Sequence, residues 1–246
     1  MKKILIAILV FTFFLEGFAQ NEETRNLPSF SKISVGESIK LIIEEGNENS
    51  ARIETTGVDA DRVLTEITGS NLNIHMERGN YRSTTVKVYL TYKSNLEAIK
   101  ASSSSSVIGK SVIKSNEMSV KVSSSASAEL SVDARELDID VSSSARASLE
   151  VNTEDLDVEV TSSGRLELSG RTSFQRFHIS SSGKFMAYGL QSERVKADIS
   201  SSGSAEISVS NELIADASSS GRILYKGNPE KVIVDASSSG KVRKAN

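Results

Sequence analysis

The sequence predicts an all-β protein built as a parallel β-solenoid, and three observations lead to this fold class. A tetrapeptide of three small hydroxyl residues followed by Gly or Ala returns along the second half of the chain. It returns at a nearly fixed period, which is the mark of a repeat architecture. Between its copies, apolar and polar residues alternate, as in strands that bury one face. The copies lie at 123–126, 142–145, 161–164, 180–183, 200–203, 218–221 and 237–240, with a looser first copy in 102–106.

The period suits one coil of a narrow solenoid. From Ser105 onward, the spacings between copies are 21, 19, 19, 19, 20, 18 and 19 residues. Nineteen extended residues trace a path of about 60 Å, enough for two or three short strands. Equivalent strands of successive coils would then stack in parallel, about 4.8 Å apart. Low-complexity disorder is the alternative for a Ser-rich chain, but the regular apolar alternation argues against it.

The last residue of each tetrapeptide is interpreted as a structural corner. Gly adopts positive φ without a side-chain penalty, which a sharp bend between strands needs. Two copies carry Ala instead, so we expect a less demanding bend there. The small hydroxyl residues beside the corner can pack in columns and bond the nearby backbone. The predicted corners are Ala126, Ala145, Gly164, Gly183, Gly203, Gly221 and Gly240.

Two charged columns flank the predicted corners and form a possible binding face. One residue after the corner, the basic members are Arg146, Arg165, Lys184 and Arg222. Five residues before it, the column is mostly acidic and includes Asp198, Asp216 and Asp235. The alternative is an ordinary solvated surface, because outward charges are typical of strands in water and cross-coil ion pairs contribute little.

The N-terminus has the pattern of a secretory signal peptide. Lys2 and Lys3 precede an apolar run, and small residues lead to Ala19, after which we expect cleavage. The run is short for a membrane span, so no membrane insertion is expected after cleavage. The chain contains no Cys, which excludes a lipid-anchored Cys, disulfides and Cys-bound metals. The predicted location is exported: periplasmic, outer-surface or extracellular.

The chain divides into four predicted segments. Residues 1–19 are the signal peptide and 20–27 a flexible, polar N-terminus. Residues 28–100 form a β-rich capping segment, in which 58–67 could hold a short helical turn. Residues 101–246 form the repeat solenoid, continuous with the segment before it. Without residues 1–19 the chain keeps 27 basic and 31 acidic side chains, since two Lys and one Glu are removed from 29 and 32. The resulting net charge of −4 argues against a nucleic-acid partner.

The layout also resembles a family of secreted bacterial proteins common in Bacteroidetes, the "putative auto-transporter adhesin, head GIN domain". The resemblance rests on the strand-like stretches 30–36, 39–46, 69–74, 86–90 and 96–99, followed by the repeating Ser-Ser-Ser-Gly turns, and covers about residues 28–243. It implies a right-handed parallel β-helix and an adhesin-like role. It implies no catalytic residues.

Candidate catalytic and metal-binding groups are few. His75 and His178 both alternate with apolar neighbours and are expected at the surface. No Gly-x-Ser-x-Gly elbow is present. The sequence therefore predicts no catalytic residues, no metal site and no cofactor. The alternative is a carbohydrate-active β-helix enzyme that uses the acidic column, where stacked carboxylates would lie about 4.8 Å apart.

The predicted function is a non-catalytic, exported binding or scaffold protein whose partner is a surface glycan or a protein. A monomer is favoured, because Lys241, Arg243 and Lys244 lie on the last predicted strand and charges at a strand edge discourage stacking. An end-to-end dimer across the final coil is the alternative.

Overall fold

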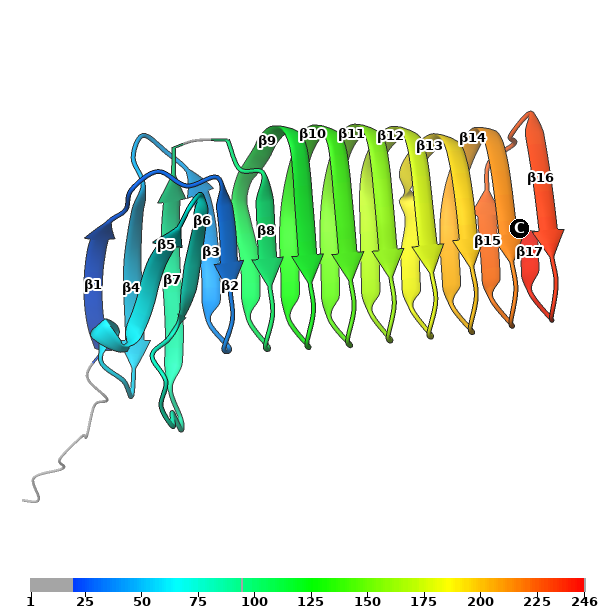
Figure 1. Cartoon of the computed structure of the whole chain (residues 1–246). Coiled ribbons are helices and arrows are strands. Elements are labelled where there is room, and N and C mark those ends of the chain that lie inside the picture. Colours follow the sequence, from blue (N-terminus) through cyan, green and yellow to red (C-terminus); the bar gives the residue numbers. More distant parts are fainter. Residues whose placement is uncertain (1–19, 94, 246) are drawn as a thin grey trace, which may run out of the picture.

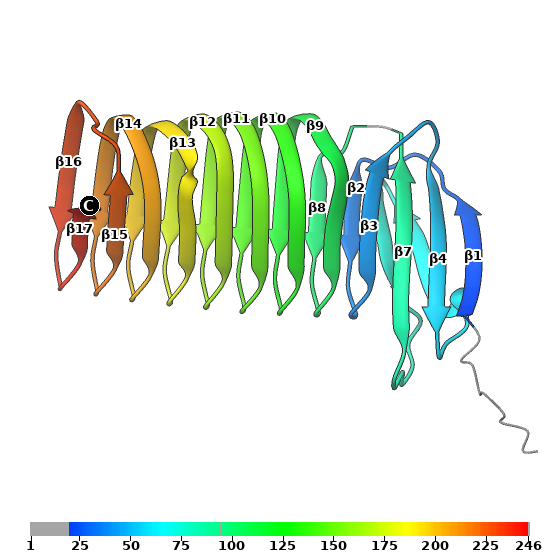
Figure 2. The ribbon, with the colours of Figure 1, turned by 180° about the vertical axis from the view of Figure 1, so that it is seen from behind.

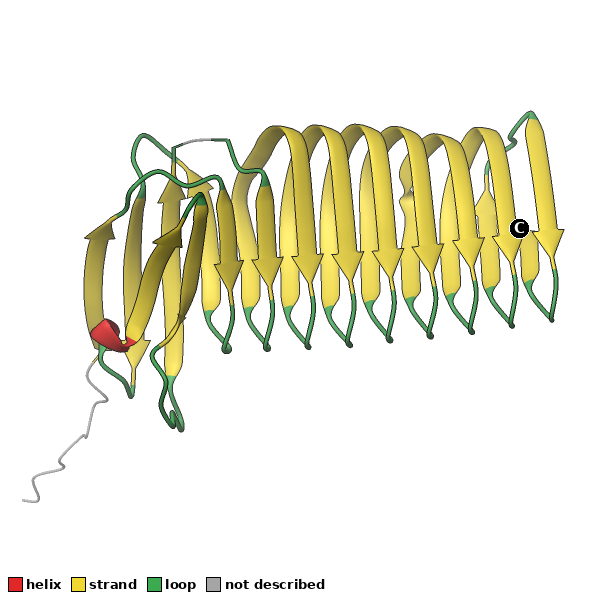
Figure 3. Ribbon diagram, viewed as in Figure 1, coloured by secondary structure: helices red, strands yellow, loops and turns green. Residues whose placement is uncertain are grey.

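The computed structural model describes residues 20–93 and 95–245, almost all of them in strands or tight turns (Figure 3). The predicted signal peptide lies outside the described residues. The strands are β1 Gln20–Asn26, β2 Lys32–Val35, β3 Lys40–Glu45, β4 Ser50–Thr56, β5 Val63–Thr68, β6 Asn71–Met76, β7 Thr85–Tyr92, β8 Ala98–Ala101, β9 Ser106–Val122, β10 Ser127–Val141, β11 Arg146–Val160, β12 Arg165–Ile179, β13 Lys184–Ile199, β14 Ser204–Ala217, β15 Arg222–Lys226, β16 Lys231–Ala236 and β17 Lys241–Lys244. The predicted all-β solenoid is confirmed.

The long strands β9 to β14 are the coils of the solenoid. Each ascends one sheet, crosses a bend and descends the opposite sheet to a tight corner (Figures 1 and 2). The path from the cap at one end to β17 at the other is right-handed in both views. Neighbouring coils pair in parallel, so like positions stack; Leu130 lies beside Leu149, for example. A continuous apolar core fills the space between the sheets. Among the described residues, no helix is long and apolar enough to cross a membrane.

The corners are type I′-like turns, and their chemistry differs from the prediction. Positive φ falls on the second and third residues of each tetrapeptide, as at Ser181 (φ 49°) and Ser182 (φ 62°), and not on the Gly that follows. The N–H of that Gly183 donates to the Ser180 carbonyl at 2.8 Å and closes the turn. The third Ser of one coil also donates to the second Ser of the next, as Ser125 does to Ser143 at 3.0 Å.

The corner glycines are needed for space. A Cβ placed on Gly183 would lie 2.3 Å from the carbonyl oxygen of Val160, and the same overlap arises at Gly164. Earlier corners have room for a side chain, since Ala126 and Ala145 occupy this place and are fully buried. The prediction that these glycines adopt positive φ is therefore wrong. They lie at the corners and are required there because a Cβ would overlap the neighbouring coil.

The first coil lies far upstream of the Ser-rich repeats. Strands β2 and β3 are joined by a corner with positive φ at Glu37 and Ser38, and the Ser38 N–H donates to the Ser103 carbonyl of the next coil at 2.9 Å. β2 pairs in parallel with β8, and β3 with β9. This corner lacks the repeat signature, because its residues are Gly-Glu-Ser and not three hydroxyl residues.

The segment between β3 and β8 forms the cap. β4 pairs antiparallel with β7, and β5 with β6, so this end of the solenoid is covered by antiparallel strands (Figure 1). A 3-10 turn at Ala60–Arg62 lies in the stretch that was expected to hold a helical turn.

The N-terminal residues 20–26 are strand β1 and not the flexible segment expected from their polarity. β1 pairs antiparallel with β4 along its whole length. Arg25 fixes it further, because its guanidinium donates to the carbonyl oxygens of Ala60 (3.0 Å) and Val63 (2.5 Å) and pairs with Glu23. Backbone pairing with a strand remote in sequence thus orders a segment that has no apolar residue of its own.

Candidate functional site

The two predicted charged columns exist, but they lie on different sheets. Each stacks in register, from Arg146 through Arg165 to Lys184 on one side and from Asp198 through Asp216 on the other. The chain reverses at every corner, and the acidic residues precede the corner while the basic residues follow it. The columns therefore face opposite sides of the solenoid and do not combine into one binding face. The in-register members are Arg146, Arg165, Lys184, Arg222 and Lys241 in one column, and Asp140, Glu159, His178, Asp198, Asp216 and Asp235 in the other.

The acidic sheet carries a shallow hollow of about 490 Å³ that includes His178 and Asp198 but neither Asp216 nor Asp235. His178 lies 3.7 Å from the Asp198 carboxylate, with both side chains about half exposed. His75 instead lies in the cap, 3.2 Å from Glu66. Within residues 20–93 and 95–245, no group of three or more His, Cys, Asp or Glu side chains is placed to hold a metal ion.

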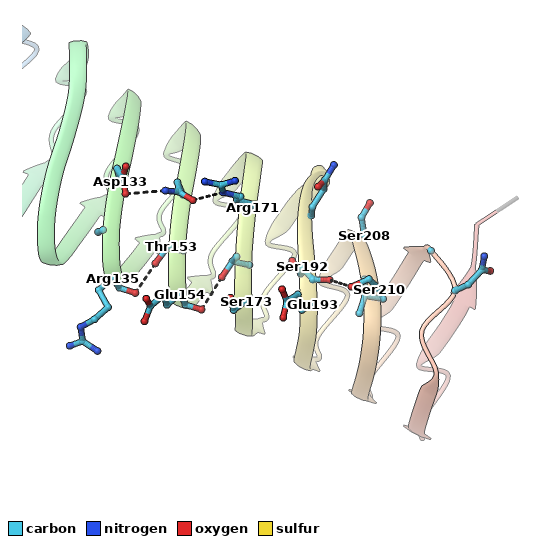
Figure 4. Close-up of a pocket in the computed structure, with 17 residues that line it drawn as sticks. Asp133, Arg135, Thr153, Glu154, Arg171, Ser173, Ser192, Glu193, Ser208 and Ser210 are labelled. Atoms are coloured by element: carbon cyan, nitrogen blue, oxygen red, sulfur yellow. Dashed lines mark hydrogen bonds between the residues drawn. The ribbon is translucent and has the colours of Figure 1, made fainter.

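A larger groove, of about 1040 Å³, runs along the bend opposite the corners. Each of the coils β10 to β14 contributes a short polar stretch to it, and Gly227 and Asn228 close its far end. Figure 4 shows these side chains on successive coils. The outward-facing members of the groove are Asp133, Arg135, Asn152, Glu154, Arg171, Ser173, Gln191, Glu193, Ser208 and Ser210.

Buried hydroxyl groups build the bend beneath this groove. Between neighbouring coils, the register of Cα partners omits the residues at the bend, as at Arg135 and Glu154. The Thr153 hydroxyl lies 3.0 Å from the Arg135 carbonyl, and the Thr172 hydroxyl lies 3.3 Å from the Glu154 carbonyl (Figure 4). A buried backbone carbonyl needs a partner. Small hydroxyl residues therefore replace apolar ones at these core positions.

The outward side chains are linked from coil to coil. Asn152 donates to the Asp133 carboxylate at 3.0 Å, and Arg171 donates to the Asn152 amide oxygen at 2.6 Å (Figure 4). Three carboxylates and two guanidinium groups line the groove, so its charges nearly cancel. The arrangement offers many fixed donors and acceptors along a straight line. Its length and near-neutral polar lining match the chemistry of an extended, uncharged polar ligand.

Sequence reasoning missed this groove. A usable signal was present: Asp133, Asn152, Arg171 and Gln191 recur at spacings of 19, 19 and 20 residues, each just before a small residue at a core position. This signal is weaker than that of the charged columns, because the recurring residues differ in charge and type from one coil to the next.

Coils that stack in register, a capped N-terminal end and a polar groove along the bend define this chain as a capped parallel β-solenoid. The family model described as "Putative auto-transporter adhesin, head GIN domain" matches residues 29–150 and 136–229. The chain belongs to this family, as the resemblance implied. Among curated proteins, none matches the chain.

Solved structures share the fold. A crystal structure described as a putative adhesin from Parabacteroides merdae ATCC 43184 has a TM-score of 0.85 and 23% sequence identity, covering 92% of this chain and 96% of that one. Two structures from Parabacteroides distasonis ATCC 8503 each cover 92% of this chain and 97% of their own. One is described as a putative adhesin (TM-score 0.81, 20% identity) and the other as a putative lipid binding protein (TM-score 0.79, 23% identity). At these identities the likeness shows the fold alone.

Proposed function

We propose that this chain is an exported, non-catalytic binding protein of adhesin type that holds a surface glycan in the groove along its bend. The observation that carries the proposal is the repetition of polar side chains in that groove, one set on each coil from β10 to β14. A repeating site suits a repeating ligand. Family membership supports the adhesin-like class, and the N-terminal pattern supports export.

The chemistry of the groove fits sugar hydroxyl groups. Amide, carboxylate and guanidinium groups are planar and offer paired donors or acceptors, as at Asn152, Arg171 and Gln191. Hydrogen bonds from coil to coil hold Asn152 and Arg171 in place before a ligand arrives, which lowers the entropy cost of binding. The near balance of charge favours a neutral glycan over a polyanion.

The enzyme alternative would use the shallow hollow on the acidic sheet, to which the acidic column contributes Asp140, Glu159 and Asp198. Asp216 and Asp235 line neither of the hollows described above. Their carboxylates lie on an open sheet surface, which offers no cleft to hold a substrate. Glycoside hydrolysis needs two carboxyl groups that flank a bound sugar. The groove at the bend is the larger of the two hollows and repeats its polar side chains from coil to coil, which suits binding of a repeating ligand.

Glycan-array binding of the purified protein tests the proposal, followed by calorimetric titration of each glycan retained. We expect the double variant Asn152→Ala with Gln191→Ala to bind about 5- to 150-fold more weakly, since each of two lost hydrogen bonds costs about 0.5–1.5 kcal/mol. The matched control is Glu167→Ala with Lys184→Ala, which alters two exposed side chains away from the groove.

Three results would overturn the proposal: no glycan retained on the array, equal binding by the groove variant, or a loss confined to the Glu167→Ala and Lys184→Ala control. Release of reducing sugar during the incubation would instead support the enzyme alternative.

A further inference from the structure

The end of the solenoid opposite the cap carries an unusual strand. β16 pairs with β14 on its inner side, and among the described residues no strand pairs with its outer side. Val232 and Val234 are in register with the core residues Leu213 and Ala215, yet they are 42% and 43% exposed. Ile233, on the outward face, is 48% exposed. Unpaired backbone groups and apolar side chains thus share one edge.

The sequence of β16 is complementary to itself in an antiparallel register. Around Ile233, the strand reads Lys-Val-Ile-Val-Asp from 231 to 235. Two such strands that run in opposite directions and cross at Ile233 place Lys231 of each copy opposite Asp235 of the other. They also place Val232 opposite Val234, and Ile233 opposite itself.

We propose that β16 is a homodimer interface, in which two copies of this chain pair their β16 strands antiparallel about a two-fold axis at Ile233. The pairing satisfies the outer backbone groups of both edges. It continues the core of each solenoid through the Val232 and Val234 side chains. It also places Lys231, which pairs with Glu212 of its own chain at 2.6 Å, opposite Asp235 of the other copy on the outward face. Opposite charges are the favourable arrangement for residues directly across a strand pair.

The basic residues of β17 are the main charges that oppose this arrangement. They lie on the other sheet, where the corner at 237–240 brings Lys244 level with Ile233. Lys241 is three residues from that level, so the two copies of Lys241 lie on opposite sides of the axis, about 20 Å apart. Salt screens charges at that separation. Lys244, which donates to Asn228 of its own chain at 2.5 Å, lies nearest the axis, and Arg243 is one residue from it. The repulsion between these like charges is a cost that the backbone pairing and apolar contacts of β16 must exceed.

A first test compares masses in solution. Light scattering of the purified protein is expected to give twice the chain mass at micromolar concentration. Ile233→Lys is expected to weaken the dimer at least tenfold, because two positive charges would meet on the axis. Ile214→Lys is the matched control: it lies in the same outward column one coil earlier, is 37% exposed, and has a paired strand on each side.

A second test fixes the register. The chain has no Cys, so Ile233→Cys introduces a single thiol. Residues directly opposite in an antiparallel pair have Cα atoms about 4.5–5.5 Å apart, within the range of a disulfide. Mild oxidation is expected to convert this variant to a covalent dimer, with little conversion of Ile214→Cys.

The proposal is overturned if the wild-type protein is a monomer and Ile233→Cys cross-links no faster than Ile214→Cys. It is equally overturned by a dimer whose mass is unchanged in Ile233→Lys. Efficient cross-linking of Val242→Cys in place of Ile233→Cys would put the contact on the other sheet. Glycan binding tests a separate region, so its failure leaves this result unaffected.

Discussion

At each corner, two serines adopt a backbone conformation that residues with a Cβ usually avoid. A left-handed residue costs roughly 1–2 kcal/mol, and the repeat corners place such a pair in every coil, for example Ser201 (φ 47°) and Ser202 (φ 61°). Hydrogen bonds offset this cost: one closes the turn, and another, from Ser202 to the Ser219 carbonyl at 3.0 Å, joins the corner to the next coil. The corners therefore form a ladder of their own.

Replacing one strained pair should stabilise the protein. Asn-Gly is the preferred dipeptide for a type I′ turn, so Ser201→Asn with Ser202→Gly is expected to raise the free energy of unfolding by about 1 kcal/mol. Urea denaturation measures the change. Ser200→Asn is the control, because Ser200 does not have positive φ. A less stable double variant would show that the serine hydroxyls contribute more than the turn geometry costs.

Substitution of a corner glycine is expected to have the opposite effect on stability. These glycines are required because a side chain has no space there, and not because their backbone conformation needs glycine. Gly183→Ala is expected to lower the free energy of unfolding by about 1–3 kcal/mol, the usual cost of overpacking, since its Cβ would overlap the Val160 carbonyl. Thermal denaturation measures the loss. The reverse change at an earlier corner, Ala145→Gly, should cost less than about 1 kcal/mol. Equal effects of the two changes would contradict this account.

At the scale of a strand, one core column contains a polar interruption. Gln175 on β12 is fully buried between Leu156 and Val195 of the neighbouring coils. Its amide oxygen accepts a hydrogen bond from Ser192 at 2.9 Å, but its amide nitrogen has no hydrogen-bond partner among the described residues. A buried donor without a partner costs about 1–3 kcal/mol.

We therefore expect Gln175→Leu with Ser192→Ala to raise the free energy of unfolding by about 1–3 kcal/mol, because the pair is replaced by apolar groups together. Urea denaturation again gives the value. Ser192→Ala alone should be destabilising, since it removes the partner of the Gln175 oxygen. A double variant that is less stable than wild type would mean that an unseen partner satisfies the amide nitrogen.

Strand stacking also affects titration on the acidic sheet. Partial desolvation raises the pKa of Asp138, and the like charge of Asp157 in the next coil raises that pKa further. The ionised form is thus disfavoured in the folded state, so its destabilising effect is present above the folded pKa and is lost as pH falls below the unfolded value.

Asp138→Asn should accordingly raise the melting temperature at pH 7, with a gain that vanishes near pH 3, below the ordinary Asp pKa of about 3.9. The effect should be modest, because the side chain is exposed and water screens it. Melting curves of both proteins across this range provide the check. A gain that grows toward acid pH would have the wrong sign.

At the scale of the whole molecule, the two ends of the solenoid differ. Antiparallel strands β1, β4 and β5 cover the N-terminal end, whereas β16 keeps an open edge among the described residues (Figure 1). β1 starts at Gln20, immediately after the predicted signal peptide. Every described strand of the cap therefore lies downstream of the expected cleavage after Ala19.

Expression in a bacterial host with a secretion pathway tests this division of the chain. Mass spectrometry of the exported protein is expected to show Gln20 as its first residue, because small residues precede the expected cleavage after Ala19. The control carries Ala19→Arg, which should slow cleavage. Membrane-bound protein that retains residues 1–19 would contradict the prediction.

The sequence alone determined the solenoid, its period and the stacking of like residues, because a 19-residue repeat with alternating apolar side chains leaves few other ways to bury them. It also predicted that Asp198 and Asp216 lie side by side in neighbouring coils, as their strand register shows. Only the tertiary structure decided that the acidic and basic columns face apart, since that depends on the reversal of the chain at each corner.

Three further features depended on contacts between residues far apart in sequence. β1 is ordered by β4, and the first coil at 32–45 joins β8 and β9 across the cap. The bend beneath the groove is stabilised because the Thr153 and Thr172 hydroxyl groups hydrogen-bond to the Arg135 and Glu154 carbonyl groups, which lie where strand pairing is interrupted. The alternation of apolar and polar residues predicts which side chains a strand buries. The hydrogen-bond partner of each backbone group depends instead on how the coils stack, which the local sequence does not specify.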